Sequence, residues 1–330
     1  AKEADVLQLG RISLDGSKVH ADASKSKAVS YKRLLELEQL LQQEVAELLA
    51  LSEQADAGAL PDNMDVQEEL VLRRTRLANL AQAKKVLEVR AEERYQAEKA
   101  EYEAKVQARE ERAREEKRKP RGRKPQPPQQ QGPRDQDQYN FTDPDSRIMK
   151  NSTDKGFDQH YNVQVAVEQD SFLIVAHSLS NHPTDRHEAL PTLDAIAPAV
   201  GTPKAAALDT GYFSAANITE MEHRGIEPYI ATGRDGHHKS WRSRFAASPA
   251  PPPEDASPLI KMAYKLKTEI GQEIYKLRKS TVEPVIGIIK EIMGFRQFSL
   301  RGVVAAAGEW CLVCLAFNLK RLHVLLAGQL

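Results

Sequence analysis

The sequence predicts an α/β fold, with a mixed sheet flanked by helices, that is interrupted by a long helical hairpin. Residues 11–19 alternate apolar and polar side chains as a strand does. Between residues 30 and 118, leucines recur at steps of three and four, which is typical of helices. After residue 139, strand-like and helix-like segments alternate along the chain. We therefore expect one sheet domain whose two parts are separated in the sequence by helices.

The first predicted strand carries an acidic residue. Ile12 and Leu14 are apolar at alternate positions, and the dipeptide Asp15-Gly16 favours turns. We therefore expect a short strand with Asp15 at or near its end.

Residues 30–118 are predicted to form an antiparallel helical hairpin. The glycine and proline within residues 57–62 mark its turn. One apolar stripe precedes this turn and a second follows it, and each is expected to bury itself against the other. The stripes consist of Leu34, Leu37, Leu41, Val45 and Leu48, and of Leu70, Leu77, Leu80, Leu87 and Ala91.

The remaining chain divides into a linker and the second part of the sheet domain. Residues 119–138 are rich in proline, glutamine and glycine, which predicts a flexible linker. Residues 139–330 are expected to complete the domain begun by residues 1–29. The predicted elements are strands 161–167 and 172–176, helix 187–197, strand 205–208, helix 214–224, strand 226–230, helix 261–290, which Gly271 can interrupt, and helix 309–326.

Composition excludes several classes of protein. Two cysteines are too few for a disulfide framework, and Cys311 and Cys314 lie in an apolar helix, where we interpret them as packing residues. The sequence has no uninterrupted run of 18 apolar residues, so we predict no membrane span, and we expect no secretory signal. The sequence contains no glycine-rich phosphate loop and no zinc-ligand spacing.

The net charge of zero hides strong local differences. The 47 basic and 47 acidic residues cancel, which alone argues against a uniformly basic nucleic-acid binder. However, residues 276–330 hold eight basic residues against three acidic ones. The sum therefore does not exclude a local DNA-binding surface.

Acidic residues at strand ends are the best candidates for chemistry. Asp15 and Asp209 each close a predicted strand, and Glu283 lies on a helix among basic residues. Carboxylates brought together in this way suit a hard divalent cation, and flanking cations suit phosphates. The alternatives are that Asp15 only forms a turn, Asp209 only caps a strand, and Glu283 is a solvated helix residue.

At these residues the chain resembles the DDE transposases of bacterial insertion sequences, in the group with a helical insertion between the first two catalytic aspartates. Tyr275, Arg278 or Lys279, Glu283 and Lys290 match that group's Tyr–Arg–Glu–Lys signature. The other similar segments are residues 14–25, 142–150, 208–214, 294–296, 301–302, 309–310 and 318–321. Family members begin with a helical DNA-binding region that this chain lacks, so we expect that an N-terminal part is missing.

The resemblance implies a ribonuclease-H-like catalytic domain with Asp15 on the first strand, Asp209 on the fourth and Glu283 on a following helix. These three residues would be both catalytic and metal-binding, with two Mg²⁺ or Mn²⁺ ions. The chain would cleave transposon-end DNA and join it to target DNA, as a homodimer on paired ends in the cytoplasm, associated with the nucleoid. The expected DNA contacts are Tyr275, Arg278, Lys279, Lys290, Arg296 and Arg301.

Several alternatives remain open at this stage. Arg278 and Lys279 compete for one role, Lys290 either contacts phosphate or is solvated, and Tyr275 either contacts phosphate or packs in the core. If Asp209 were dispensable, Asp22 or Asp185 would be the replacement acid. A non-catalytic scaffold derived from a transposase, or a nuclease without strand transfer, would carry the same features.

Overall fold

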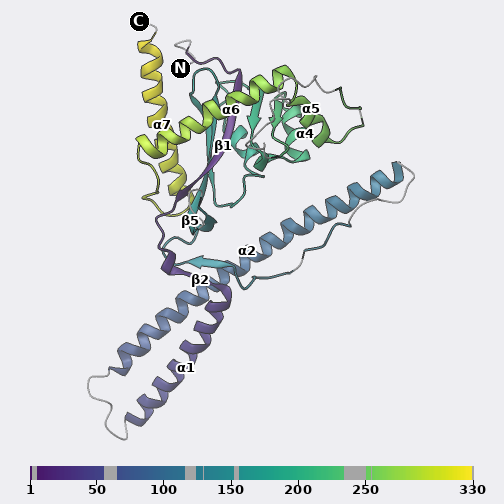
Figure 1. The fold of residues 1–330 in the computed structure, drawn as a ribbon. Helices are drawn as coiled ribbons and strands as arrows, with labels where there is room; N and C mark the ends of the chain where they lie inside the picture. Colours follow the sequence, from purple (N-terminus) through teal and green to yellow (C-terminus); the bar gives the residue numbers. More distant parts are fainter. Residues whose placement is uncertain are drawn as a thin grey trace. The chain divides into compact units, whose positions relative to one another are not determined.

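The computed structural model describes residues 1, 6–55, 65–115, 124–128, 130–151, 156–233, 250–253 and 255–328. The chain divides into two compact units (Figure 1). Unit 1 combines Ala1–Ala23 with Asp145–Leu330, and unit 2 is Ser24–Pro144. The first unit therefore receives its strands from both ends of the chain.

Unit 1 is built on a mixed six-stranded sheet. Its strands are β1 (Arg11–His20), β4 (Arg147–Lys150), β5 (Phe157–Glu168), β6 (Ile174–Ser180), β7 (Ala205–Leu208) and β8 (Glu227–Ile230). The order is β4-β5-β1-β7-β8, and β6 also pairs with β5. Strand β5 is antiparallel to β1, β4 and β6, whereas β1, β7 and β8 are parallel. The predicted mixed α/β fold is confirmed, and it is compatible with a ribonuclease-H-like domain.

The expectation that Asp15 ends a short strand is wrong. Strand β1 pairs with β5 from Ile12 to His20, so Asp15 lies in mid-strand opposite Val165. The long ladder with β5 outweighs the local turn preference of Asp-Gly, because strand formation depends mainly on tertiary pairing. On the other side of β1, strand β7 ends opposite Leu14. The edge of β1 next to Asp15 and Gly16 is therefore not covered by β7.

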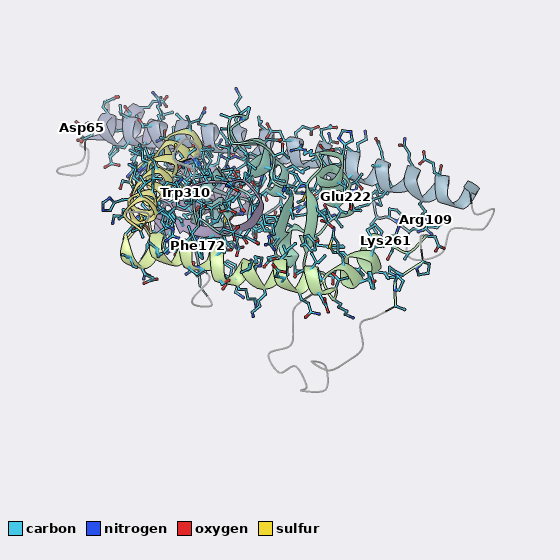
Figure 2. All side chains as sticks on the ribbon, turned by 90° about the horizontal axis from the view of Figure 1, so that it is seen from above. Asp65, Arg109, Phe172, Glu222, Lys261 and Trp310 are labelled. Carbon is cyan, nitrogen blue, oxygen red and sulfur yellow. The ribbon has the colours of Figure 1, made fainter. Side chains whose placement is uncertain are left out.

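Helices cover both faces of the sheet (Figure 1). On one face, α6 (Glu269–Gly287) and α7 (Val303–Ala327) pack on alternate residues of β1 and β5. Trp310 of α7, labelled in Figure 2, is buried there and donates to the Gln164 carbonyl oxygen at 3.3 Å. The opposite face packs against α3 (Ala189–Asp194), α4 (Ala215–His223) and α5 (Pro258–Lys265). Because strand residues alternate, Asp15 points towards α6, on the face opposite to Leu14.

Two helix predictions need correction, and a third is refined. The helix expected over 261–290, with an interruption near Gly271, is divided just before Gly271 into α5 and α6, and it ends in a π-helical turn, Ile288–Ile292. The break occurs because the Thr268 hydroxyl accepts from the Gly271 N–H at 3.1 Å and caps a new helix. The helix expected over 187–197 is shorter, at Ala189–Asp194, and α7 begins at Val303 rather than at residue 309.

Among the described helices, α7 alone has the length and composition of a membrane span. An 18-residue window of α7 has a mean hydropathy of 1.5, and 22% of that window is buried. Core helices of other proteins have the same length and composition.

Unit 2 is a helical hairpin with a two-stranded sheet at its base. It contains β2 (Ala28–Ser30), α1 (Tyr31–Ala55), α2 (Val66–Glu115) and β3 (Gln138–Asn140). The helices α1 and α2 pack against each other, and the predicted turn at residues 57–62 lies outside the described residues. From the two predicted stripes, the buried residues are Leu34, Leu41, Leu48, Leu70, Leu80, Leu87 and Ala91.

The second half of the predicted linker is anchored. Residues 119–123 and 129 lie outside the described residues. Further on, Arg134 pairs with Glu98 of α2 at 2.9 Å, and Asp137 pairs with Arg94 at 2.9 Å. Composition predicts flexibility over the whole of 119–138, whereas these ion pairs hold its C-terminal end on α2.

Candidate active site

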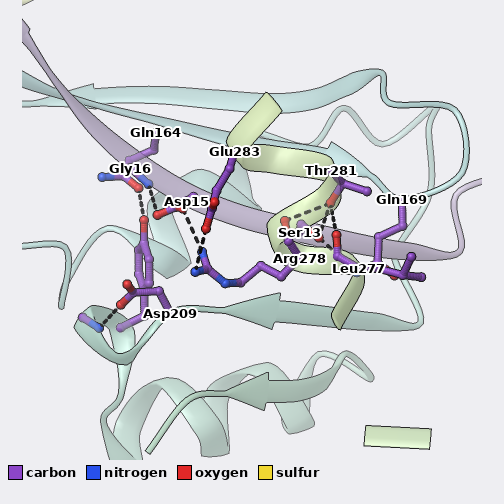
Figure 3. Close-up of polar contacts among 12 residues, drawn as sticks. Ser13, Asp15, Gly16, Gln164, Gln169, Asp209, Leu277, Arg278, Thr281 and Glu283 are labelled. Atoms are coloured by element: carbon purple, nitrogen blue, oxygen red, sulfur yellow. Dashed lines mark hydrogen bonds and ion pairs between the residues drawn. The ribbon is translucent and has the colours of Figure 1, made fainter. Parts of the chain in front are cut away.

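The site is centred on Asp15 in the middle of β1 (Figure 3). Arg278 reaches it from α6, and Nη1 donates to Asp15 Oδ2 at 2.7 Å. The Gly16 N–H donates to the other carboxylate oxygen at 2.9 Å. Only 7% of the Arg278 side chain and 20% of the Asp15 side chain are exposed. The pair is therefore largely withdrawn from solvent.

Burial controls the protonation of Asp15. Loss of solvation raises its pKa to about 6, even though the charge of Arg278 and the Gly16 hydrogen bond lower it. The nearby carboxylate of Asp209 raises the pKa of Asp15 further. Two like charges near each other in a poorly solvated place favour a bound proton or a bound cation.

Asp209 lies beside Asp15 because β7 runs parallel to β1. Leu208 pairs with Leu14, so the two aspartates follow at equivalent positions on neighbouring strands. The Asp209 carboxylate caps the 3₁₀ turn Thr210–Tyr212 by accepting from the Gly211 N–H. Parallel pairing thus brings together two acids that are far apart in the sequence.

Glu283 joins the same group from α6. Its Oε1 lies 3.5 Å from Arg278 Nη2, and 51% of its side chain is exposed. The guanidinium of Arg278 therefore contacts both Asp15 and Glu283, as Figure 3 shows. A buried polar layer fixes α6 on β1, since Thr281 Oγ1 lies 2.8 Å from Ser13 Oγ.

The donor set suits a hard divalent cation in its chemistry. Asp15, Asp209 and Glu283 offer only carboxylate oxygens, the ligands that Mg²⁺ prefers. The described residues contain no group of three or more acidic, histidine or cysteine side chains already arranged around one metal position. Instead, the guanidinium of Arg278 is the cation among these carboxylates. A metal ion would replace or adjoin that positive charge.

A cavity of about 910 Å³ is lined by Asp209 and by Arg278, which contacts the other two carboxylates. Thr210 and residues of α6 also line it. The basic and aromatic residues in its lining are Lys267, Tyr275, Lys276, Arg278 and Lys279. Such a lining attracts a polyanion to the carboxylate site.

The structure separates the two residues that compete in the signature. Both residues line the cavity, but Arg278 is 7% exposed and forms ion pairs with Asp15 and Glu283. Arg278 is therefore occupied by the carboxylates, whereas no ion pair between Lys279 and a carboxylate is found among the described residues. Tyr275 also lines the cavity, and the Arg278 guanidinium carbon lies 5.8 Å from the centre of its ring.

The other three predicted DNA contacts lie among different partners. Lys290 Nζ donates to the Lys18 carbonyl oxygen at 2.8 Å, and burial followed by the charge of Arg296 lowers its pKa. Arg296 pairs with Glu291, and both side chains are more than half exposed. Arg301 pairs with Asp22 at 2.9 Å. The described lining of the cavity does not include Lys290, Arg296 or Arg301.

Sequence reasoning missed a polar network beside the aspartates. Gln164 of β5 accepts from the Tyr212 hydroxyl and donates to Asp185 at 3.0 Å. Asn162 donates to the same Asp185 oxygen at 2.7 Å. The signal was present, because Asn162 and Gln164 alternate with apolar residues and so share one face of a predicted strand.

Comparison with known families adds a partial match. Residues 253–323 match the model of a family described as the transposase DDE domain. This segment holds α6 with Arg278 and Glu283 and most of α7, but not Asp15 or Asp209. No curated protein and no solved structure matches the chain. The match supports a DDE transposase on the segment that contributes Glu283.

Proposed function

We propose that this chain is the catalytic region of a metal-dependent DNA transposase of a bacterial insertion sequence. One observation carries the proposal: Asp15 and Glu283, from opposite ends of the chain, share one buried guanidinium next to Asp209. Such a convergence of acids is costly unless a cation balances it. The family match over residues 253–323 supports the same assignment.

In the proposed reaction, Asp15, Asp209 and Glu283 hold two Mg²⁺ or Mn²⁺ ions. Bound divalent ions supply an activated water or 3′-hydroxyl and stabilise the leaving oxygen. The side chains of Lys276 and Lys279 bind backbone phosphates where the cavity opens next to Asp209. The chain would first cleave transposon-end DNA and then join the exposed 3′-hydroxyl to target DNA.

The partners follow from that reaction. Double-stranded transposon ends and target DNA are the substrates, and two copies of the chain would act on paired ends in the cytoplasm. Arg296 and Arg301 would exchange their exposed ion pairs for phosphates outside the cavity. Lys290 would support the segment that carries Arg296 through its bond to the Lys18 carbonyl oxygen.

The test is nicking of supercoiled plasmid DNA by the full chain with Mg²⁺ or Mn²⁺. Replacing Asp209→Asn should reduce cleavage at least about a hundredfold, because even indirect support of a metal commonly contributes 10–100-fold. The matched control is Asp170→Asn, on the exposed turn between β5 and β6. Circular dichroism should show that both variants fold.

Three outcomes would contradict the proposal. Full cleavage by the Asp209→Asn variant would remove this acid from the site. Cleavage by the unaltered chain without joined products would favour a nuclease. DNA binding without any metal-dependent cleavage would favour a non-catalytic scaffold.

A further inference from the structure

A fourth carboxylate, Asp185, lies next to the two aspartates and is held by buried amides. Asn162 Nδ2 and Gln164 Nε2 donate to its Oδ1 at 2.7 and 3.0 Å. Both amides are almost fully buried on β5, and the Tyr212 hydroxyl donates to Gln164 Oε1. One oxygen of Asp185 is thus fixed, while its Oδ2 has no hydrogen-bond partner in the described part of the chain.

Two glycines leave space for this carboxylate. A Cβ atom on Gly16 would lie 2.9 Å from Asp185 Oδ1, which is closer than real Cβ contacts. A Cβ atom on Gly211 would lie 3.4 Å from Asp185 Oδ2 and 3.3 Å from Asp209 Oδ1. Gly16 follows Asp15 directly, and Gly211 follows Asp209 by two residues. Asp185 therefore lies against the backbone that carries both proposed metal ligands.

The shape of the sheet explains how Asp185 reaches them. Gln164 and Asn162 point to the face opposite to Asp15, so Asp185 approaches from that face. Because β7 ends opposite Leu14, its ladder does not cover the edge of β1 at Gly16. At this uncovered edge, a side chain from one face of the sheet can therefore approach the residues on the other face.

Electrostatics supports this convergence independently. Burial raises the pKa of the Tyr212 hydroxyl, and the charges of Asp185, Asp15 and Asp209 raise it further. Four carboxylates, these three and that of Glu188, thus act on a single buried hydroxyl, and Asp185 has the largest effect among them. Arg278 balances Asp15 and Glu283, but no basic side chain among the described residues pairs with Asp185.

We infer that Asp185 contributes a fourth carboxylate to the divalent-cation site of Asp15 and Asp209. The inference rests on the proposed function, which places a cation at those two aspartates. In this arrangement the amides of Asn162 and Gln164 hold Oδ1 and keep Oδ2 directed at the space beside Gly211 and Asp209.

The test measures Mn²⁺ binding to the full chain by electron paramagnetic resonance of the free ion. Replacing Asp185→Asn keeps the shape and the acceptor for both amides but removes the charge. We expect Mn²⁺ affinity to fall about tenfold or more. The matched control is Asp194→Asn on the neighbouring helix α3, whose side chain is 62% exposed and paired with Arg224, and it should bind as the unaltered chain does.

A second variant tests the same space without changing any charge. The backbone of Gly211 has a conformation that alanine also adopts. In Gly211→Ala, the added methyl group would contact one oxygen of Asp209 and one of Asp185. We expect weaker Mn²⁺ binding, whereas Gly308→Ala on α7, where a Cβ meets nothing within 4 Å, should have no effect. If Asp185→Asn failed to fold, unchanged Mn²⁺ affinity in Gly211→Ala would overturn the inference.

The outcomes distinguish this inference from the proposed function. Equal Mn²⁺ affinity in folded Asp185→Asn and in the unaltered chain would overturn the role of Asp185, even if plasmid nicking persisted. Weaker binding by Asp185→Asn in a chain that never nicks DNA would support the ligand and contradict the transposase. An unaltered chain that binds no Mn²⁺ would overturn the inference as well.

Discussion

The two units of the chain arrange their charges in opposite ways. In unit 2, acids and bases of α1 and α2 pair with each other near the surface, as Arg73 does with Glu44 and Lys84 with Glu38. In unit 1, the carboxylates of Asp15 and Glu283 share the buried cation Arg278, and the charge of Asp209 also acts on it. Pairs of the first kind are common and contribute little. A crowded set of acids is unfavourable for folding, which is why it points to a functional site.

The two units also differ in how deeply these paired cations are buried. Arg278 pairs with two carboxylates from distant segments, and among the described residues its buried Nε has no hydrogen-bond partner. If the difference between the units is real, removing a cation should have large consequences in unit 1 and small ones in unit 2.

The largest expected effect is that of Arg278→Met. The substitution keeps most of the aliphatic volume but leaves Asp15 without its ion-pair partner in a poorly solvated place. Breaking a buried pair in this way costs roughly 3 to 5 kcal/mol of unfolding free energy. Urea unfolding at pH 7.5 without divalent ions would measure it, and the loss should shrink at pH 5, where Asp15 binds a proton.

The matched control for Arg278 is Arg296→Met. Arg296 pairs with Glu291, and the two side chains are 60% and 63% exposed. Its removal should change the unfolding free energy by less than about 1 kcal/mol. Equal losses of unfolding free energy in Arg278→Met and Arg296→Met would mean that the burial of Arg278 does not make its ion pairs more important than those of the exposed Arg296.

The next effect is a pH dependence caused by Asp15. Its pKa is about 6 in the folded chain and 3.8 in its ordinary state, so the folded chain binds more protons between these values. Stability from this group is therefore present below pH 4 and is lost as the pH rises through 6. Two pKa units correspond to about 3 kcal/mol. Between pH 4 and pH 7.5 the unaltered chain should therefore lose about 3 kcal/mol of unfolding free energy relative to the Asp15→Asn variant, which has no titratable proton to lose at this position.

A flat difference across that pH range would contradict the raised pKa of Asp15. The comparison needs metal-free protein, because a bound divalent ion would lower the pKa and hide the effect. Asp170→Asn serves as the control, since Asp170 is an exposed aspartate outside the site.

Local patterns predicted much of the fold. Leucine stripes predicted α1 and α2, because helix periodicity is a local property, and seven of the ten stripe residues are buried. Alternation predicted the strand that is β5, a strand was predicted where β6 lies, and the helix predicted over 214–224 begins where Ser214 caps α4 by accepting from the Asn217 N–H. These elements follow from residues close together in the sequence.

The remainder depends on contacts that no local pattern contains. The turn preference of Asp15-Gly16 is overridden by the long pairing of β1 with β5. The inward direction of Arg278 depends on Asp15, which lies 263 residues earlier. The role of Asp185 becomes visible only when two glycines and two amides from separate segments meet it.

The smallest expected effect is that of Lys84→Met in unit 2. Lys84 Nζ lies 2.9 Å from Glu38 Oε2, and the side chains are 32% and 21% exposed. Methionine keeps the aliphatic stem on the helix surface, and Glu38 remains accessible to water. We therefore expect a loss of less than about 1 kcal/mol in urea unfolding at low salt, and still less at high salt.

The same hairpin provides the reference for a large effect. Leu34 is fully buried between α1 and α2, and Leu34→Ala should cost roughly 2 to 5 kcal/mol. A loss from Lys84→Met close to that of Leu34→Ala would show that the ion pairs of unit 2 are as critical as its apolar core. The distinction between paired surface charges in unit 2 and crowded acids in unit 1 would then fail. A small, salt-sensitive loss of unfolding free energy in Lys84→Met would show that the ion pair of unit 2 contributes little to stability. The large electrostatic effects would then be those of the carboxylates around Arg278.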